Sequence, residues 1–331
     1  MAEKKKELVT INLSERWLPE YRISTGVIAF DRVLNGGIPS GRLTELFGGE
    51  SAYKSLVVLQ ILAEAAKDDK FLVVLADTEH SVEKGLVDMV GLDVSKLHYL
   101  DIDAWSRDKK DKKDKKDKMA GSIESIFDSL EAGLNKAYDL EKRLVFAWDS
   151  VAATPGYEDL VGALGRNEAS MRRAKLLKSG LDKYMGRLAK ANACFILVNQ
   201  IQDKIGVQFG SKITTPGGRS IKHWASLRMR FRTIGSIKDE NSKEKIATNG
   251  NLSIEKHKAG RPFGEVNFEQ YVGEPLSKYT GLLDYMTRHG EIGQAGSYYY
   301  FPDDKENTFY SKDFPEIYEK RNKKEEKNGK H

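Results

Sequence analysis

The feature that most constrains this chain is a glycine-rich turn between an apolar run and a helix-like segment. Residues 43–47 have the length and composition of a buried strand, and residues 56–62 have the apolar spacing of a helix. The turn and the start of the helix read Gly48, Gly49, Glu50, Ser51, Ala52, Tyr53, Lys54, Ser55 and Leu56. Backbone N–H groups at such a helix N-terminus form an anion cradle, in which a lysine reaches the outer phosphates and a serine hydroxyl binds magnesium. The turn predicts a site for ATP and Mg²⁺, with a chance Gly-Gly turn before a lysine as the alternative.

Tyr53 departs from this pattern, because a glycine normally precedes the lysine of a phosphate loop. A tyrosine forced into a glycine-like positive φ would store strain of about 1–3 kcal/mol. We therefore expect position 53 to influence nucleotide affinity and selectivity.

The composition indicates a globular protein, with 40% hydrophobic and 31% charged residues. The length of 331 residues suits one large domain plus a smaller one. No apolar run approaches the roughly 18 residues of a membrane span, and the N-terminus lacks the apolar stretch of a secretory signal. We predict a cytoplasmic protein with no membrane partner, in which the single Cys194 is a small buried residue.

The net charge of +5 is concentrated in two segments. Residues 109–118 hold seven lysines and three aspartates, and residues 320–331 hold six basic residues and two glutamates. The rest of the chain is therefore net acidic, so the basic pI is weak evidence for nucleic-acid binding by the folded body. The low-complexity segment 107–118 has no apolar face and is predicted to be a disordered surface loop; a phosphate-binding tether is the alternative.

Three further apolar runs have polar residues at their ends. They span residues 71–76, 144–150 and 195–198, and are followed or closed by Glu79, Asp149 and Gln200. Chemistry in open α/β sheets collects at the carboxyl ends of the strands. Glu79 is therefore a candidate base and Asp149 a candidate magnesium carboxylate, although a strand-end aspartate taken alone is as often a turn residue.

The remaining segments are predicted from periodicity and glycine content. Helices are expected over residues 122–141 and 174–191, and a mobile loop with three arginines over residues 155–173. Residues 201–218 are glycine-rich without periodicity, which points to function or disorder. Antiparallel strands are expected over residues 226–234, 251–256 and 264–271, followed by a small C-terminal region with an aromatic cluster at 298–301.

Taken in order, these features resemble the RecA-type recombinases of bacteria and phages over residues 24–315. The resemblance is carried by residues 77–80, 149–153, 199–210, 214–218 and 256–263. It implies an α/β fold: a RecA-like P-loop ATPase core whose mostly parallel sheet is extended by antiparallel strands, plus a small α+β C-terminal domain. The expected division is an oligomerisation segment at 1–23, the core at 24–273, the small domain at 274–318 and a charged flexible tail at 319–331.

The resemblance also implies residue roles. Residues 48–56 would bind ATP, Ser55 and Asp149 would support Mg²⁺, and Glu79 would activate water beside Lys54. Gln200 would sense the γ-phosphate, while Lys256 and Lys258 would act on ATP held by a neighbouring subunit. DNA would contact the 156–173 and 200–219 loops through Arg166, Arg172, Arg173, Gln202, Lys204, Ile205, Gly206, Gly217, Gly218 and Arg219.

The implied function is that of an ATP-dependent DNA strand-exchange recombinase. It would polymerise on single-stranded DNA, pair it with homologous duplex DNA and serve recombination and repair, with a single-strand-binding protein or loading mediator as a further partner. Residues 7–13 are the candidate docking strand, and a phage-encoded protein in the bacterial host cytoplasm is expected. The alternatives are a helicase on the same core and a non-hydrolysing paralogue or mediator; the presence of Lys54 and Glu79 weighs against the latter.

Overall fold

A central sheet of eight strands organises the chain. The structure is a computed structural model that describes residues 19–50, 53–100, 121–161, 169–203 and 213–327. The strand order is β12-β11-β10-β3-β7-β6-β4-β5, with parallel pairing from β10 to β5 and antiparallel pairing among β10, β11 and β12. The strands are β3 (Leu43–Gly48), β4 (Phe71–Asp77), β5 (Leu97–Leu100), β6 (Arg143–Asp149), β7 (Cys194–Gln200), β10 (Leu227–Lys238), β11 (Lys245–His257) and β12 (Glu265–Tyr271).

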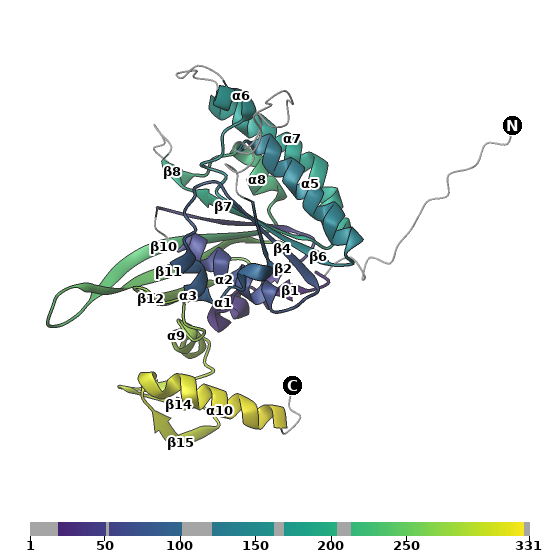
Figure 1. The fold of residues 1–331 in the computed structure, drawn as a ribbon. Helices are drawn as coiled ribbons and strands as arrows, with labels where there is room; N and C mark the ends of the chain where they lie inside the picture. Colours follow the sequence, from purple (N-terminus) through teal and green to yellow (C-terminus); the bar gives the residue numbers. More distant parts are fainter. Residues whose placement is uncertain (1–18, 51–52, 101–120, 162–168, 204–212, 328–331) are drawn as a thin grey trace.

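Helices cover both faces of this sheet (Figure 1). The helices α1 (Ile28–Val33), α2 (Lys54–Ala66) and α3 (Lys84–Val90) contribute to one apolar cluster, and α5 (Ile123–Asp139), α7 (Ala169–Lys190) and α8 (Gly218–Trp224) contribute to another on the opposite face. The inner strands are buried on both faces, as their continuous apolar runs require. The short helix α6 (Tyr157–Val161) precedes α7.

A smaller unit follows the sheet and lies below it in Figure 1. It contains α9 (Leu282–Arg288), the three-stranded sheet β13 (Gly293–Ala295), β14 (Tyr298–Phe301) and β15 (Asp304–Phe309), and α10 (Phe314–Lys327). Its aromatic residues Phe301, Phe309 and Phe314 belong to the same apolar cluster as Phe30 beneath the main sheet. The predicted fold class, a mostly parallel sheet with antiparallel extensions and a small C-terminal sheet with helices, is confirmed.

Two short pairings and two 3₁₀ turns complete the described chain. The strand β1 (Arg22–Ile23) pairs antiparallel with β2 (Ile38–Pro39), and β8 (Gln202–Asp203) pairs antiparallel with β9 (Ile213–Thr214). The 3₁₀ turns are Val94–Lys96 and Ser311–Asp313. Among the described helices, none has the length and apolar character needed to cross a membrane.

Two predicted boundaries are wrong. Helix α7 begins at Ala169, so Arg172 and Arg173 are helical and not part of a mobile loop. Arg172 forms ion pairs with Asp159 and Glu158, and these contacts hold the first turns of the helix in place.

The C-terminal boundary also differs, because α10 continues through Lys327 into the segment predicted to be a flexible tail. Phe314 and Tyr318 of this helix are buried, and Arg321 forms an ion pair with Asp303 in the turn between β14 and β15. The strands β10 and β11 are longer than predicted, since the outer half of β10 is largely exposed and the outer half of neither strand carries an apolar run. The predicted loop 107–118 and docking strand 7–13 lie outside the described residues.

Candidate active site

The candidate site lies at the carboxyl ends of four adjacent strands. The strands β3, β7, β6 and β4 are neighbours in that order, and all run in parallel. Their register places Gly48 beside Gln200, and Asp77 beside Asp149. The sheet thus brings the phosphate-loop turn, the candidate base, the candidate metal carboxylate and the candidate sensor to one edge, as predicted from the strand ends.

The phosphate-loop turn joins β3 to α2. Gly48 ends the strand, Gly49 and Glu50 follow, and Lys54 is the first residue of the helix, with Ser55 and the half-buried Leu56 behind it. Lys54 is a buried residue, 8% exposed, and its Nζ donates a 2.6 Å hydrogen bond to the Gly49 carbonyl. Burial lowers the pKa of Lys54, while the carboxylates of Asp149 and Glu79 act in the opposite direction. Ser51 and Ala52 lie outside the described residues.

Tyr53 takes the left-handed conformation expected from the missing glycine. Its φ is 62° and its ψ is −3°, and its carbonyl accepts the hydrogen bond from the Val57 N–H. The buried ring packs edge-to-face on Phe268 of β12, with the ring centroids 5.0 Å apart. The Tyr53 side chain therefore strains the turn and also attaches it to the core by packing on Phe268.

Asp149 closes β6 as a buried carboxylate, with 2% of its surface exposed. Burial raises its pKa to about 6, and the negative charges of Glu79 and Asp77 add to the rise, while a hydrogen bond from Ser55 and the charge of Lys54 oppose it. Its Oδ1 atom is buried without a hydrogen-bond partner among the described residues. A buried carboxylate oxygen without a partner, next to a serine hydroxyl, is a hard-oxygen donor set that fits Mg²⁺.

Glu79 follows β4 and is held by two partners. Its Oε1 accepts hydrogen bonds from the Ser150 hydroxyl and, at 3.1 Å, from the Gln200 amide. The candidate base and the candidate sensor are thus in direct contact. Ser150 was missed from the sequence, although its position directly after Asp149 at a strand end could have identified it.

The loop that carries Glu79 is fixed by the buried Asp77 carboxylate. It accepts hydrogen bonds from the backbone N–H groups of Glu79, Ser81 and Val82, at 3.2, 3.3 and 3.0 Å. The Thr78 hydroxyl also donates to the Ser150 carbonyl at 2.8 Å, which ties this loop to the end of β6. Asp77 therefore orients the loop of Glu79, a role that sequence reasoning did not assign.

A second buried network connects the end of β7 with helix α8. Asn199 donates to Glu45 of β3 at 3.0 Å and to the carbonyl of Pro216 at 3.1 Å. Glu45 also pairs with Arg228 of β10 at 2.6 Å, and both side chains are almost fully buried. The residue next to Gln200 is thereby linked to the last turn before α8.

Lys256 and Lys258 lie at the C-terminal end of β11, toward the opposite ends of the strands from the phosphate loop. In the strand register, Arg228 of β10 lies opposite Lys256 of β11 on one side and opposite Glu45 of β3 on the other. Glu45 precedes Gly48 by three residues. At ~3.3 Å per residue, Lys256 is set back about 10 Å along the strands from the phosphate loop, and two strands aside. The Lys256 Nζ instead donates to the carbonyls of Lys222 at 2.6 Å and His223 at 3.1 Å, at the end of α8.

The predicted DNA-contacting residues are only partly described. Gln202 lies in β8, while Gly217 is the N-cap of α8 and Gly218 and Arg219 open that helix. Arg172 and Arg173 are engaged within the chain, and Arg173 donates to the carbonyl of Ala152. Arg166, Lys204, Ile205 and Gly206 lie outside the described residues.

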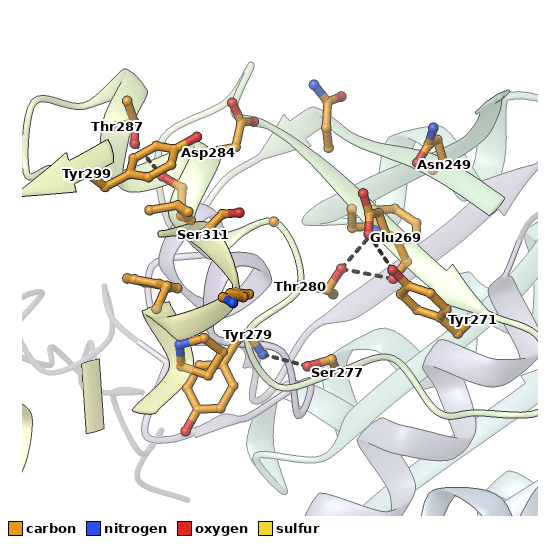
Figure 2. Close-up of a pocket in the computed structure, with 18 of the residues that line it drawn as sticks. Asn249, Glu269, Tyr271, Ser277, Tyr279, Thr280, Asp284, Thr287, Tyr299 and Ser311 are labelled. Carbon is orange, nitrogen blue, oxygen red and sulfur yellow. Dashed lines mark hydrogen bonds between the residues drawn. The ribbon is translucent and has the colours of Figure 1, made fainter. Parts of the chain in front are cut away.

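A large cavity lies away from all these residues. It has a volume of about 800 Å³ and is lined by β12 and the segment that leads into the small C-terminal unit, including Glu269, Thr280 and Tyr299 (Figure 2). None of the phosphate-loop or strand-end residues lines it. We therefore locate the nucleotide site from the chemistry at the strand ends and not from cavity size.

Comparisons with known proteins identify the family of this chain. A family model described as RecA N-terminal domain matches residues 9–110 and 135–277. The chain is 32% identical over 302 residues to "Protein RecA" of Rubrobacter xylanophilus, covering 89% of this chain and 80% of that protein. It is also 32% identical over 282 residues to "Protein RecA" of Aquifex aeolicus, covering 85% and 74% respectively. The chain belongs to the RecA family of recombinases.

Proposed function

We propose that this RecA-family recombinase and DNA-dependent ATPase couples the hydrolysis of ATP with Mg²⁺ to the assembly of a filament on single-stranded DNA. The observation that carries the proposal is the contact between Glu79 and Gln200, next to Lys54 and Asp149 at one edge of the sheet. A base that touches the sensor of the γ-phosphate can respond to nucleotide and DNA together. The filament would then pair its strand with homologous duplex DNA.

The residues around the phosphate loop would bind different parts of the nucleotide complex. Lys54 and the backbone N–H groups of the loop would bind the phosphates, and Ser55 with Asp149 would hold the cation. Bound Mg²⁺ would neutralise charge on the β- and γ-phosphate oxygens. The buried Oδ1 of Asp149, which has no hydrogen-bond partner among the described residues, supports this assignment, because a nearby cation would favour the ionised form that burial disfavours.

Glu79 would orient the attacking water and accept its proton. The Ser150 hydroxyl and the Gln200 amide both donate to Oε1, so the carboxylate is held in one orientation. Positioning is the main contribution that a protein makes to phosphoryl transfer. A shift of Gln200 toward the γ-phosphate would change how Glu79 is held, and the Asn199–Pro216 contact would pass the shift toward α8.

Lys256 and Lys258 would act on the ATP of a neighbouring subunit. The strand register sets Lys256 far from its own phosphate loop, so the pair cannot easily serve its own site. Cationic side chains supplied in trans stabilise the charge of the transition state, in the manner of an arginine finger. Turnover would therefore require assembly, and the head-to-tail contact would generate a helical filament.

DNA would be gripped by the segment between β7 and α8. Gln202, Gly217, Gly218 and Arg219 lie at the described ends of this segment, and Lys204, Ile205 and Gly206 complete the proposed set together with Arg166, Arg172 and Arg173. Contacts to the backbone and the faces of bases make binding sequence-tolerant and salt-sensitive. We further propose a single-strand-binding protein or loading mediator as a partner, and a phage-encoded origin with the host cytoplasm as location. We also propose residues 24–273 as the core, followed by a small domain that begins at residue 274 and includes all of α10.

The test is ATP hydrolysis with and without single-stranded DNA. We expect DNA to stimulate the wild type, and Glu79→Gln to lower stimulated turnover by about 10²–10⁴-fold while ATP still binds. Glu83→Gln, which removes the same charge at the exposed N-cap of α3, serves as the matched control. Undiminished turnover in Glu79→Gln would remove Glu79 from the proposed role.

A further inference from the structure

The turn that carries Lys256 and Lys258 is fixed from the inside by the residue between them. Successive side chains of a strand point to opposite sides, so Lys256 and His257 at the end of β11 face in opposite directions. Both lysines reach the end of α8, where Lys256 Nζ lies 3.1 Å and Lys258 Nζ 3.5 Å from the His223 carbonyl. His257 is 6% exposed, and its Nε2 lies 3.0 Å from the carbonyl of Leu34.

The tautomer of His257 follows from this contact. A carbonyl oxygen can only accept, so Nε2 carries the proton and donates to Leu34. The other ring nitrogen, Nδ1, is buried without a hydrogen-bond partner among the described residues. The imidazole is therefore held through a single hydrogen bond to the turn that follows α1.

Arg22 of β1 joins the same two turns from another direction. Its guanidinium donates to the carbonyls of Leu34 and Gly37, both at 3.2 Å, and to the carbonyl of Ala259 at 2.7 Å. Leu34 is thus shared by Arg22 and His257, and Ala259 directly follows Lys258. The planar fork of an arginine suits such a three-carbonyl contact, which a lysine cannot reproduce.

Gly260 completes the packing of this turn. A Cβ at this position would lie 2.5 Å from His257 Nε2, so no larger residue fits without displacing the ring. On the opposite side, the Lys258 N–H donates to the Ser226 carbonyl at 2.7 Å. The backbone from residue 256 to residue 260 is thereby fixed by contacts with three separate segments of the chain.

We propose that His257 and Arg22 are positioning residues that hold Lys256 and Lys258 in the geometry needed at the ATP site of the neighbouring subunit. This inference rests on the proposed function of the two lysines in trans. Neither residue lies near the phosphate loop of its own subunit. Their loss should therefore lower turnover only at the ATP site of the neighbouring subunit. A misplacement of the lysines by about 1 Å would lower turnover by up to about 100-fold.

The test uses two kinds of substitution at each position. His257→Leu keeps apolar bulk but removes the donor, and His257→Gln supplies an amide donor in its place. Arg22→Gln removes the three-carbonyl contact. If His257→Leu does not fold, Arg22→Gln still tests the inference. The matched control is Arg32→Gln, because Arg32 pairs with Glu291 of the C-terminal unit and does not touch the lysine turn.

We expect His257→Leu and Arg22→Gln to lower DNA-stimulated ATP hydrolysis by about 10- to 100-fold, with affinity for ATP and for single-stranded DNA unchanged. His257→Gln and Arg32→Gln should retain turnover close to wild type. Full turnover in both His257→Leu and Arg22→Gln overturns the inference.

Mixed filaments separate a positioning role from a general structural one. Each variant is mixed in equal amounts with Glu79→Gln, which has a disabled site but intact lysines. In such a filament, a site is active only where a subunit with an intact Glu79 has a Glu79→Gln subunit as the neighbour that supplies the lysines. With random mixing this occurs at about one quarter of the subunits, so about one quarter of wild-type turnover per subunit should return from two inactive proteins. A variant damaged in its own site would show no such recovery, which would overturn the inference.

Mixing Glu79→Gln with Lys256→Ala/Lys258→Ala is the benchmark. Recovery in the benchmark but not with His257→Leu or Arg22→Gln rejects this inference and leaves the trans role of the lysines standing. Absence of recovery in the benchmark itself rejects the trans role, and this inference with it.

Discussion

The two ends of the central sheet hold their charged side chains in opposite ways. At the carboxyl end, Asp149 is buried with an oxygen that lacks a partner among the described residues, and burial raises the pKa of this carboxyl to about 6. At the other end, Lys256 is satisfied by two helix carbonyls. Helix C-termini favour cations, so this contact is stable within one subunit.

This difference suggests how a family member can bind nucleotide alone and hydrolyse it only in an assembly. The carboxyl end contains groups whose electrostatic cost is relieved by phosphates and a cation. The other end keeps its two cations on backbone carbonyls of its own chain, and in the proposed function they would act on a different subunit. The predictions below test the two ends separately, beginning with the largest expected effect.

The lysine pair should have the largest effect. We expect Lys256→Ala/Lys258→Ala to lower DNA-stimulated turnover by about 10³-fold, because cations supplied in trans stabilise transition-state charge. ATP binding by the isolated subunit should be unchanged, as measured with a fluorescent nucleotide. The control is Lys238→Ala/Lys245→Ala, which removes two exposed lysines paired across the far end of the same β10–β11 hairpin. Equal losses in both double variants would contradict a specific role.

The pKa of Asp149, about 6, predicts that the contribution of Mg²⁺ to ATP binding depends on pH. Protonation removes the charge that the cation requires, so Mg²⁺-dependent ATP binding should weaken by about tenfold per pH unit below pH 6. Titration calorimetry with and without Mg²⁺ between pH 5 and 8 measures this. Asp149→Asn should bind weakly throughout and lose the pH dependence, and an unchanged pH profile in that variant would assign the titration to another group.

The same carboxyl predicts the sign of a stability effect. Its folded pKa lies above the unfolded value of 3.8, so the folded state binds the proton more tightly. Its contribution to the free energy of unfolding is therefore fully present below pH ~4 and falls by about 3 kcal/mol as pH rises through ~6. Urea unfolding in the absence of nucleotide should show this fall in the wild type and a smaller one in Asp149→Asn.

Tyr53 should have the smallest effect, because two contributions oppose each other. Replacing it with glycine would relieve about 1–3 kcal/mol of strain at its φ of 62° but would remove a buried ring, which costs about 3–5 kcal/mol. We expect Tyr53→Gly to lower the free energy of unfolding by about 1–3 kcal/mol in urea titrations. Tyr53→Phe keeps the ring and should match the wild type. A Tyr53→Gly chain more stable than the wild type would show that strain outweighs packing.

The sequence alone determined the architecture of the carboxyl edge. The phosphate-loop turn, Glu79, Asp149 and Gln200 could be placed at one edge because each follows or closes a short apolar run, and parallel strands bring such ends together. The glycine-like φ of Tyr53 was predictable for a related reason, since the geometry of a phosphate loop is set within a few residues. Structural features that depend on residues close together in the chain can be predicted from the sequence.

Only the tertiary structure decided the contacts between distant segments. Arg22 reaches Ala259, Asn199 reaches Glu45, and Tyr53 packs on Phe268, although each pair is separated by more than about 150 residues. No local periodicity encodes such pairs, and the same holds for Arg172, whose helix is held by ion pairs with Asp159 and Glu158. These contacts depend on strand order and helix placement, which burial of the two apolar clusters fixes for the chain as a whole.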